Sequence, residues 1–156
     1  MVVRTDSTAF STIHSYFAFD HARLDAALAE LAGQVDRGDI HRAMRDFAQF
    51  ERGMKRHLHI EEDVLFQLYA FDRTGYSKVP TQTLQSDHVR IVEAIEEMGE
   101  ALGAHDVFAF RAALIKLNAI LPEHNAKEEH VLYPLVDSLL GAAEAERLVG
   151  RLRSGR

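Results

Sequence analysis

The chain has 156 residues, enough for one compact domain, and its 47% hydrophobic content can supply a substantial core. Its formal net charge is −6 and its basic residues are scattered, which argues against nucleic acid as a partner, since phosphate binding needs a basic surface. The sequence contains no cysteine, which excludes disulfides, thiolate zinc sites and cysteine-held iron–sulfur clusters.

Four long segments carry hydrophobic residues spaced by three and four positions, the pattern of amphipathic helices. They are expected over about 12–36, 40–70, 81–102 and 107–138, and residues 142–149 could form a short fifth helix. The buried faces of the second and fourth segments are expected to end with Val64 and Leu68, and with Leu132 and Leu135. Gly103 should lie just past the end of the third helix, and Pro122 predicts a kink or a break in the fourth.

Four amphipathic helices with short connections predict an all-α fold, an antiparallel up-and-down four-helix bundle. Residues 1–156 are expected to form a single domain. No segment has the roughly 20 apolar residues of a membrane span, and the N-terminal residues contain no apolar run of signal-peptide length. A cytoplasmic protein without a membrane partner is therefore expected.

The chain contains an internal duplication with an offset of 67 residues, measured from His57 to His124. The sequence HLHIEEDVLFQLY from His57 recurs as HNAKEEHVLYPLV from His124, and DHARL around His21 recurs as DHVRI around His88. The repeated units cover about 12–70 and 81–138. This repetition predicts two helical pairs related by a pseudo-two-fold axis.

Six polar residues occupy positions where the helical pattern requires core side chains. They are His21, His57, Glu61, His88, His124 and Glu128. Helical residues four apart have Cβ atoms about 5–6 Å apart, so each His-x-x-x-Glu pair can direct a nitrogen and an oxygen at one point. One such histidine alone is usually an ordinary core residue. Six such groups together, buried without partners, would cost several kcal/mol for each carboxylate, and a bound metal removes that cost.

The ligand set of imidazole and carboxylate is compatible with iron, manganese, zinc or nickel. Six protein ligands would saturate a single ion, so two ions are favoured. If both carboxylates and one oxygen atom bridge the ions, about two positions remain for solvent or a small ligand. The two glutamates contribute only two negative charges, which predicts a positively charged centre that attracts small anions, peroxide or reduced dioxygen.

Other polar residues of the repeat are expected to have ordinary roles. Glu62 and Glu129 lie about 100° round the helix from the ligand glutamates and are expected to face solvent or a helix neighbour. Asp20 and Asp87 are expected at the surface or in caps, with the orientation of a ligand imidazole as the alternative for all four acids. Tyr133 is expected in the core or a pocket wall, with metal coordination as its alternative.

These motifs resemble those of the hemerythrin family, specifically the His-His-Glu (HHE) cation-binding domain of its bacterial members. The resemblance covers nearly the whole chain and rests on DHARL at His21, HLHIEEDVLF at His57, SDHVRI at His88 and HNAKEEHVLYP at His124. It implies a four-helix bundle around two iron ions in a non-haem Fe–O–Fe centre that binds dioxygen reversibly. It also implies that the four histidines are terminal ligands and that Glu61 and Glu128 bridge the irons, with zinc or manganese as possible substitutes.

Two features differ from the oxygen-carrying members. Their fifth histidine falls at Val92 here, and their last carboxylate is an aspartate five residues beyond its histidine, where this chain has Glu128 four beyond His124. A more open site is therefore expected. The leading hypothesis is a di-iron protein that binds or senses dioxygen or a related small oxidant. The alternatives are an enzyme that consumes peroxide or nitric oxide, and a metal-storage or zinc-stabilised bundle without a redox role.

Overall fold

The computed structural model describes residues 10–70 and 81–155, and every regular element in these ranges is helical. The elements are α1 (Ile13–Asp36), α2 (Ile40–Ile60), η1 (Glu61–Leu65), α3 (Phe66–Ala70), α4 (Thr81–Gly103), α5 (Val107–Lys127), η2 (Glu128–Leu132), α6 (Tyr133–Leu140) and α7 (Ala142–Ser154). The predicted all-α class is confirmed. Each of the four predicted long helices is present within a few residues of its expected ends.

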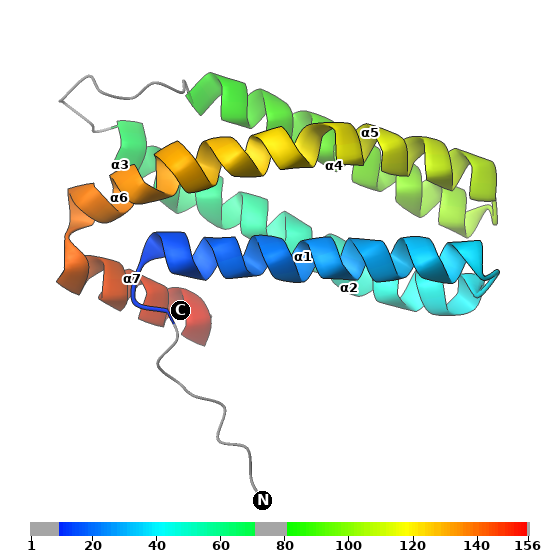
Figure 1. Ribbon diagram of the computed structural model, residues 1–156, viewed down its shortest axis with the longest axis horizontal. Helices are drawn as coiled ribbons and strands as arrows, with labels where there is room; N and C mark the ends of the chain where they lie inside the picture. The colour runs from blue at the N-terminus through cyan, green and yellow to red at the C-terminus, as the bar shows by residue number, and fades with distance from the viewer. Residues whose placement is uncertain (1–9, 71–80, 156) are drawn as a thin grey trace, which may run out of the picture.

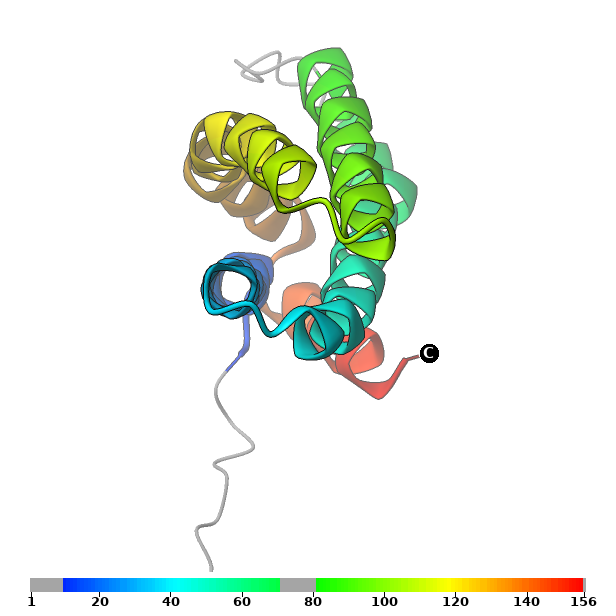
Figure 2. The ribbon, with the colours of Figure 1, turned by 90° about the vertical axis from the view of Figure 1, so that its right-hand side faces the viewer.

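The long helices lie side by side along the longest axis of the molecule (Figure 1). Short turns join α1 to α2 and α4 to α5, and both turns lie at the same end of the bundle, on the right of Figure 1. Viewed from that end, the α1–α2 pair lies beside the α4–α5 pair (Figure 2). Contacts between α1 and α5, and between α2 and α4, close the bundle.

Side-chain caps fix the beginnings of α1, α2 and α5. Thr12 and Ser15 form a reciprocal capping box at α1, and the Asp106 carboxylate accepts the Ala109 N–H at 2.9 Å at α5. The carboxylate of Asp137 in α6 accepts the N–H of Ile13 at 2.7 Å, so it places negative charge at the positive end of the α1 dipole. This contact also joins the last part of the bundle to its first helix.

Two local predictions were wrong in part: of the kink or break expected at Pro122 the break is absent, and Gly103 ends the third helix from within it. Pro122 does not break the fourth helix, because α5 continues from Val107 to Lys127. Leu121 and His124 beside it are buried, and this packing offsets the loss of one backbone hydrogen bond. Gly103 is the last residue of α4 rather than a left-handed residue beyond it, and His105 adopts the positive φ of 55° in this turn.

The predicted fifth helix is present as α7 and extends to Ser154. Its buried face is Ala145, Leu148, Val149 and Leu152, and the guanidinium of Arg56 in α2 donates to the Leu152 carbonyl at 2.7 Å. None of the described helices is long and apolar enough to cross a membrane.

Two hydrophobic clusters divide the interior along the bundle axis. The first contains Leu24, Met54, Ile91 and Leu121, and the second contains Phe17, Leu65, Phe66, Leu132 and Tyr133. On α1, His21 lies between Phe17 of the second cluster and Leu24 of the first. The polar residues of the repeat therefore form a layer between two apolar cores.

Candidate metal centre

Each half of the bundle changes its helical geometry at the glutamate of its His-x-x-x-Glu motif. The π-helical segments η1 and η2 begin at Glu61 and at Glu128. A π-turn places one extra residue in the helix, and such turns are frequent at functional sites. In both segments the N–H after the turn, of Phe66 or Tyr133, bonds to the carbonyl of that glutamate.

The π-turns shift the buried face of each helix by one residue. Leu65 and Phe66 are buried, whereas the expected Val64 and Leu68 are half-buried. In the other half, Leu132 is buried as expected, but Tyr133 and Val136 are buried where Leu135 was expected. Phe66 and Tyr133 thus face the interior next to the polar layer.

The structure brings all six predicted site residues together. His21, His57, Glu61, His88, His124 and Glu128 are each at most 5% exposed. Their donor atoms form two groups of four, each within 4.8 Å: one contains the two glutamates with His21 and His57, the other the same glutamates with His88 and His124. The glutamates are shared, so the geometry has two metal-sized positions, called here position A (His21, His57) and position B (His88, His124).

Each carboxylate directs one oxygen to each position. Glu61 Oε1 lies 3.2 Å from His57 Nε2 in position A, and Glu61 Oε2 lies 3.3 Å from His88 Nε2 in position B. Glu128 repeats this arrangement, with Oε2 3.3 Å from His21 Nε2 and Oε1 3.1 Å from His124 Nε2. A carboxylate placed in this way can bridge two ions.

The donor separations fit transition-metal ions. Donors about 2.1 Å from a shared ion lie about 3.0 Å apart in octahedral geometry and about 3.4 Å apart in tetrahedral geometry. Four atoms that face the two positions have no hydrogen-bond partner within residues 10–70 and 81–155: His57 Nε2, Glu61 Oε2, His88 Nε2 and Glu128 Oε1. Each unpaired buried polar atom costs about 1–3 kcal/mol, and an ion in each position would use all four as donors.

A second layer of carboxylates supports the imidazoles and corrects the expected roles of four acids. Nδ1 of each histidine faces an acid on another helix: Glu129 at 2.7 Å from His21, Asp20 at 2.9 Å from His57, Glu62 at 2.8 Å from His88, and Asp87 at 3.5 Å from His124. Nδ1–H donates to the carboxylate in the three shorter pairs, so the Nε2 lone pair faces the centre. These acids keep part of their surface exposed and also reach an imidazole that a neighbouring helix places beside them.

The electrostatics of the layer favour ionised bridging glutamates and charged rings of His57 and His88 as long as no ion is bound. Burial alone would lower the pKa of His57, but the charge of Glu61 and the bond to Asp20 outweigh it and raise the pKa to about 10. Burial would likewise lower the pKa of His88, but close contacts with the charged Glu128 and Glu61 raise it to about 10. Burial opposes the charge on Glu128, yet its close contacts with His124, His21 and His88 hold its pKa well below the usual range.

Tyr133 lies inside the polar layer, which the helical pattern alone did not indicate. Its hydroxyl donates to Glu61 Oε1 and approaches Glu128 Oε2 and His21 Nε2, both at 3.1 Å. Burial, with the nearby charges of both glutamates, raises the pKa of Tyr133 well above its usual value. The repeat contained a signal for this residue, because the equivalent position of the other half is Phe66.

A small internal void adjoins the polar layer on the side of the first hydrophobic cluster. It has a volume of about 10 Å³, close to the minimum for one water molecule. Four pairs of residues that are equivalent in the repeat line it: His57 and His124, Leu24 and Ile91, Met54 and Leu121, and Leu58 and Asn125. His21 and Asp25 of α1 line it without their mates in the repeat, so the void is offset toward α1, although histidines of both positions border it.

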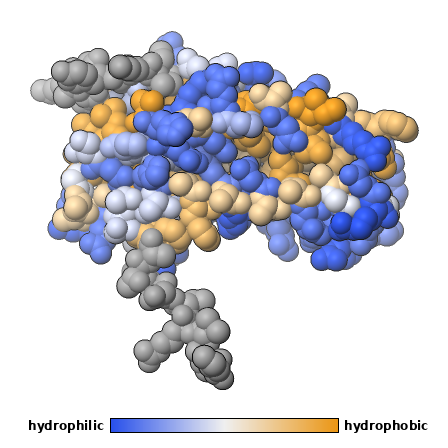
Figure 3. Space-filling view, viewed as in Figure 1, coloured by the Kyte–Doolittle hydropathy of each residue, from blue (hydrophilic) through white to orange (hydrophobic). Residues whose placement is uncertain are grey.

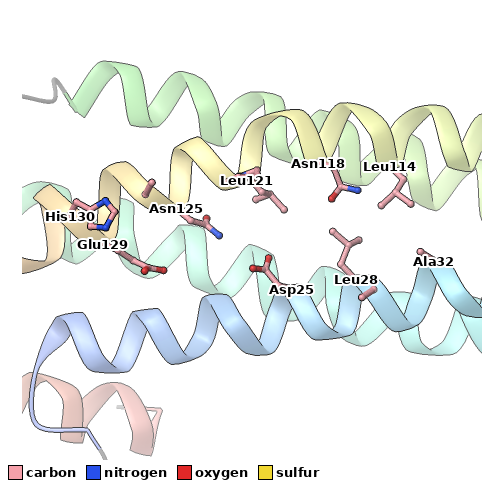
Figure 4. Close-up of a pocket in the computed structure, with 12 residues that line it drawn as sticks. Asp25, Leu28, Ala32, Leu114, Asn118, Leu121, Asn125, Glu129 and His130 are labelled. Atoms are coloured by element: carbon pink, nitrogen blue, oxygen red, sulfur yellow. The ribbon is translucent and has the colours of Figure 1, made fainter.

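A groove of about 500 Å³ runs between α1 and α5 and shares Asp25, Leu121 and Asn125 with this void. In Figure 4 the side chains of Asp25 and Asn125 extend toward each other from the two helices. Farther along, the groove is lined by Leu28, Ala29, Ala32 and Leu114. On the same face, Figure 3 shows hydrophobic surface between hydrophilic patches toward the right-hand end.

Comparison with protein families gave one match, in which the model described as the hemerythrin HHE cation binding domain covers residues 12–136. These residues include all six buried donors and both π-turns. Comparisons with curated proteins and with solved structures gave no match.

Proposed function

The chain belongs to the hemerythrin HHE cation-binding domain family, and we propose that it holds two iron ions at positions A and B to bind or sense dioxygen or a related small oxidant. The observation that carries the proposal is the division of both glutamates between two sets of histidines. A site for one ion would not need both oxygens of each carboxylate to face different imidazoles. The antiparallel up-and-down four-helix arrangement predicted from the sequence is part of this proposal.

The charge around the centre favours a neutral ligand. The two bridging glutamates and the four outer carboxylates carry six negative charges, whereas two divalent or trivalent ions carry four to six positive charges. The positive centre expected from the glutamates alone is therefore largely neutralised. Arg23, Arg90 and Lys127 pair with outer carboxylates and offset part of this charge. Dioxygen and nitric oxide suit such a centre better than anions do.

The size of the void limits the ligand to a few atoms. Its volume of about 10 Å³ suits one water molecule, and it is bounded by Leu24, Met54 and Ile91. An organic substrate would have to displace these core side chains, at a cost of about 1–3 kcal/mol for even modest overpacking. Iron bound next to this void would supply one-electron redox chemistry. The protein would hold the imidazoles in one orientation and exclude larger molecules.

The direct test measures metal content and colour. Protein expressed in iron-rich medium should contain two irons per chain and should develop charge-transfer absorption in the near ultraviolet after exposure to air. Replacing Glu61 or Glu128 by alanine should lower the iron content well below two ions, because each removes a donor from both positions. The exposed Asp63, replaced by alanine, serves as the control and should leave the content unchanged.

Three results would redirect the proposal. Colourless protein that contains only zinc would indicate a structural metal bundle. Steady consumption of added peroxide or nitric oxide would identify an enzyme at the same centre. Full iron content in the Glu61→Ala and Glu128→Ala variants would contradict the bridging role.

The groove between α1 and α5 is the access path that fits this function. The repeat relates this groove to a second groove, between α2 and α4. The second groove has Leu58 and Val92 at the positions that Asn125 and Asp25 occupy in the first. Replacing Asn125 by leucine would place in the α1–α5 groove the apolar side chain that the related groove has at Leu58. We expect slower oxidation of the reduced protein by air with unchanged iron content. The reverse change, Leu58→Asn, is the matched control, and equal rates in wild type and Asn125→Leu would exclude this path.

A further inference from the structure

The two metal positions differ at one atom, the hydroxyl oxygen of Tyr133. All three of its polar contacts belong to position A: the Glu61 oxygen that faces His57, the Glu128 oxygen that faces His21, and His21 Nε2 itself. The side chain is fully buried and stacks on Phe17, with ring centroids 5.0 Å apart and an interplanar angle of 28°. It has little freedom to turn away.

Among the residues that the structure describes, position B has no equivalent donor. The residue related to Tyr133 by the repeat is Phe66, whose ring stacks on His88 with centroids 5.3 Å apart and an interplanar angle of 23°. Two of the buried atoms without a hydrogen bond, Glu61 Oε2 and Glu128 Oε1, are the carboxylate oxygens that face position B. Their counterparts in position A contact the Tyr133 hydroxyl.

We propose that Tyr133 is a fifth protein ligand of the ion in position A, and that position B has one protein ligand fewer and takes up the small exogenous ligand. This inference rests on the proposed function. When the phenolic oxygen binds the ion, its lone pair forms the new bond and the O–H proton is released to solvent, without any change in oxidation state. The void lies on the side of the first hydrophobic cluster, whereas Tyr133 belongs to the second. The tyrosine therefore does not block the ligand.

The absorption spectrum of the oxidised, iron-loaded protein tests the assignment. A ferric ion bound to phenolate gives a charge-transfer band in the visible region that imidazole and carboxylate ligands do not give. We expect this band in the wild type, its loss in Tyr133→Phe, and its persistence in Tyr16→Phe, a half-buried tyrosine that packs beside Phe17 outside the layer. The Mössbauer spectrum should show two different ferric environments in the wild type and more similar ones in Tyr133→Phe.

A double variant distinguishes the loss of a phenolate ligand from other effects of removing the Tyr133 hydroxyl. Tyr133→Phe combined with Phe66→Tyr moves the phenol to the other half, and we expect the visible band to return. Iron content is measured for every variant and should remain at two per chain, because the four histidines and two glutamates of the centre are intact. A wild type with two irons and no phenolate band, or a Tyr133→Phe variant that keeps the band, would overturn this inference and leave the di-iron proposal standing. A wild type that binds no iron would overturn both.

Discussion

The outer carboxylates allow a graded test of how the protein holds its metal, and Glu62 is the most informative of them. Its Oε1 lies 2.8 Å from His88 Nδ1, and the opposite nitrogen of that ring lies 3.3 Å from Glu61 Oε2 in position B. Loss of such a partner typically lowers metal affinity by about 10–100-fold. The Glu62 side chain is 43% exposed, so water can replace part of the contact. We therefore expect Glu62→Ala to weaken binding about tenfold, or about 1.4 kcal/mol.

Zinc is a suitable ion for this measurement because it has no redox chemistry, and its affinity can be determined by competition with a coloured chelator. Asp63→Ala is the matched control, since Asp63 is adjacent in sequence but pairs with the exposed His59 at 3.0 Å. Asp20 is only 22% exposed and lies 2.9 Å from His57, so Asp20→Ala should have a larger effect, nearer the hundredfold limit. Equal affinities in the Glu62→Ala and Asp63→Ala variants would refute this reasoning.

Two further predictions concern the whole fold. An alanine at Gly99 would place its Cβ 2.9 Å from the ring of the buried Phe47, so Gly99→Ala should lower the melting temperature. The Cβ of Gly150→Ala, on the exposed face of α7, would meet nothing within 4 Å, so this change should raise the melting temperature by a few degrees. Shifts of the melting temperature with the same sign in both variants would contradict this packing. The metal-free protein should lose stability as the pH rises from about 6.5 toward 10, since the raised pKa values of His57 and His88 stabilise the fold only while these rings are protonated. Thermal unfolding across this range should show a falling midpoint, and a constant or rising midpoint would exclude the charged imidazoles.

The helices and the six central donors could be predicted from the sequence because both depend on spacing alone. Hydrophobic residues at intervals of three and four marked each helix, and the helix bounds differ from the expected ones mainly at the C-terminal ends. The donors were recognisable because polar residues recurred on apolar faces at a fixed offset. A repeat of this kind is independent of the tertiary contacts that decide finer details.

The outer carboxylates were assigned wrongly because their roles depend on neighbouring helices. A residue one position from a buried ligand is about 100° round the helix, and on an isolated helix it would face solvent. In the bundle, the ring of His88 on α4 lies beside Glu62, and the ring of His57 on α2 lies beside Asp20. The repetition of these acids in both halves was a signal that helical periodicity did not use.

The register shift after each motif could not be predicted from periodicity. A π-turn has no hydrophobic pattern of its own, and it moves every later residue round the helix by the angle of one residue. This shift explains why Val64 and Leu68 are only half-buried. It also explains why Tyr133 reaches the centre instead of Leu135.

Residues that are repeated in both halves and residues that differ between the halves have different roles in the proposed site. Two similar ions require the same set of ligands at both positions. The histidines, glutamates and outer carboxylates that form this set are all duplicated. Reaction with a small ligand requires the two positions to differ, since the ligand needs only one path inward and one ion with a free coordination position. Under the proposals above, two of the residue pairs that differ between the halves create this inequality: Tyr133 opposite Phe66 at the ions, and Asn125 opposite Leu58 on the path. If this division is correct, exchanging both pairs in one protein should preserve metal content and direct the ligand to the other ion.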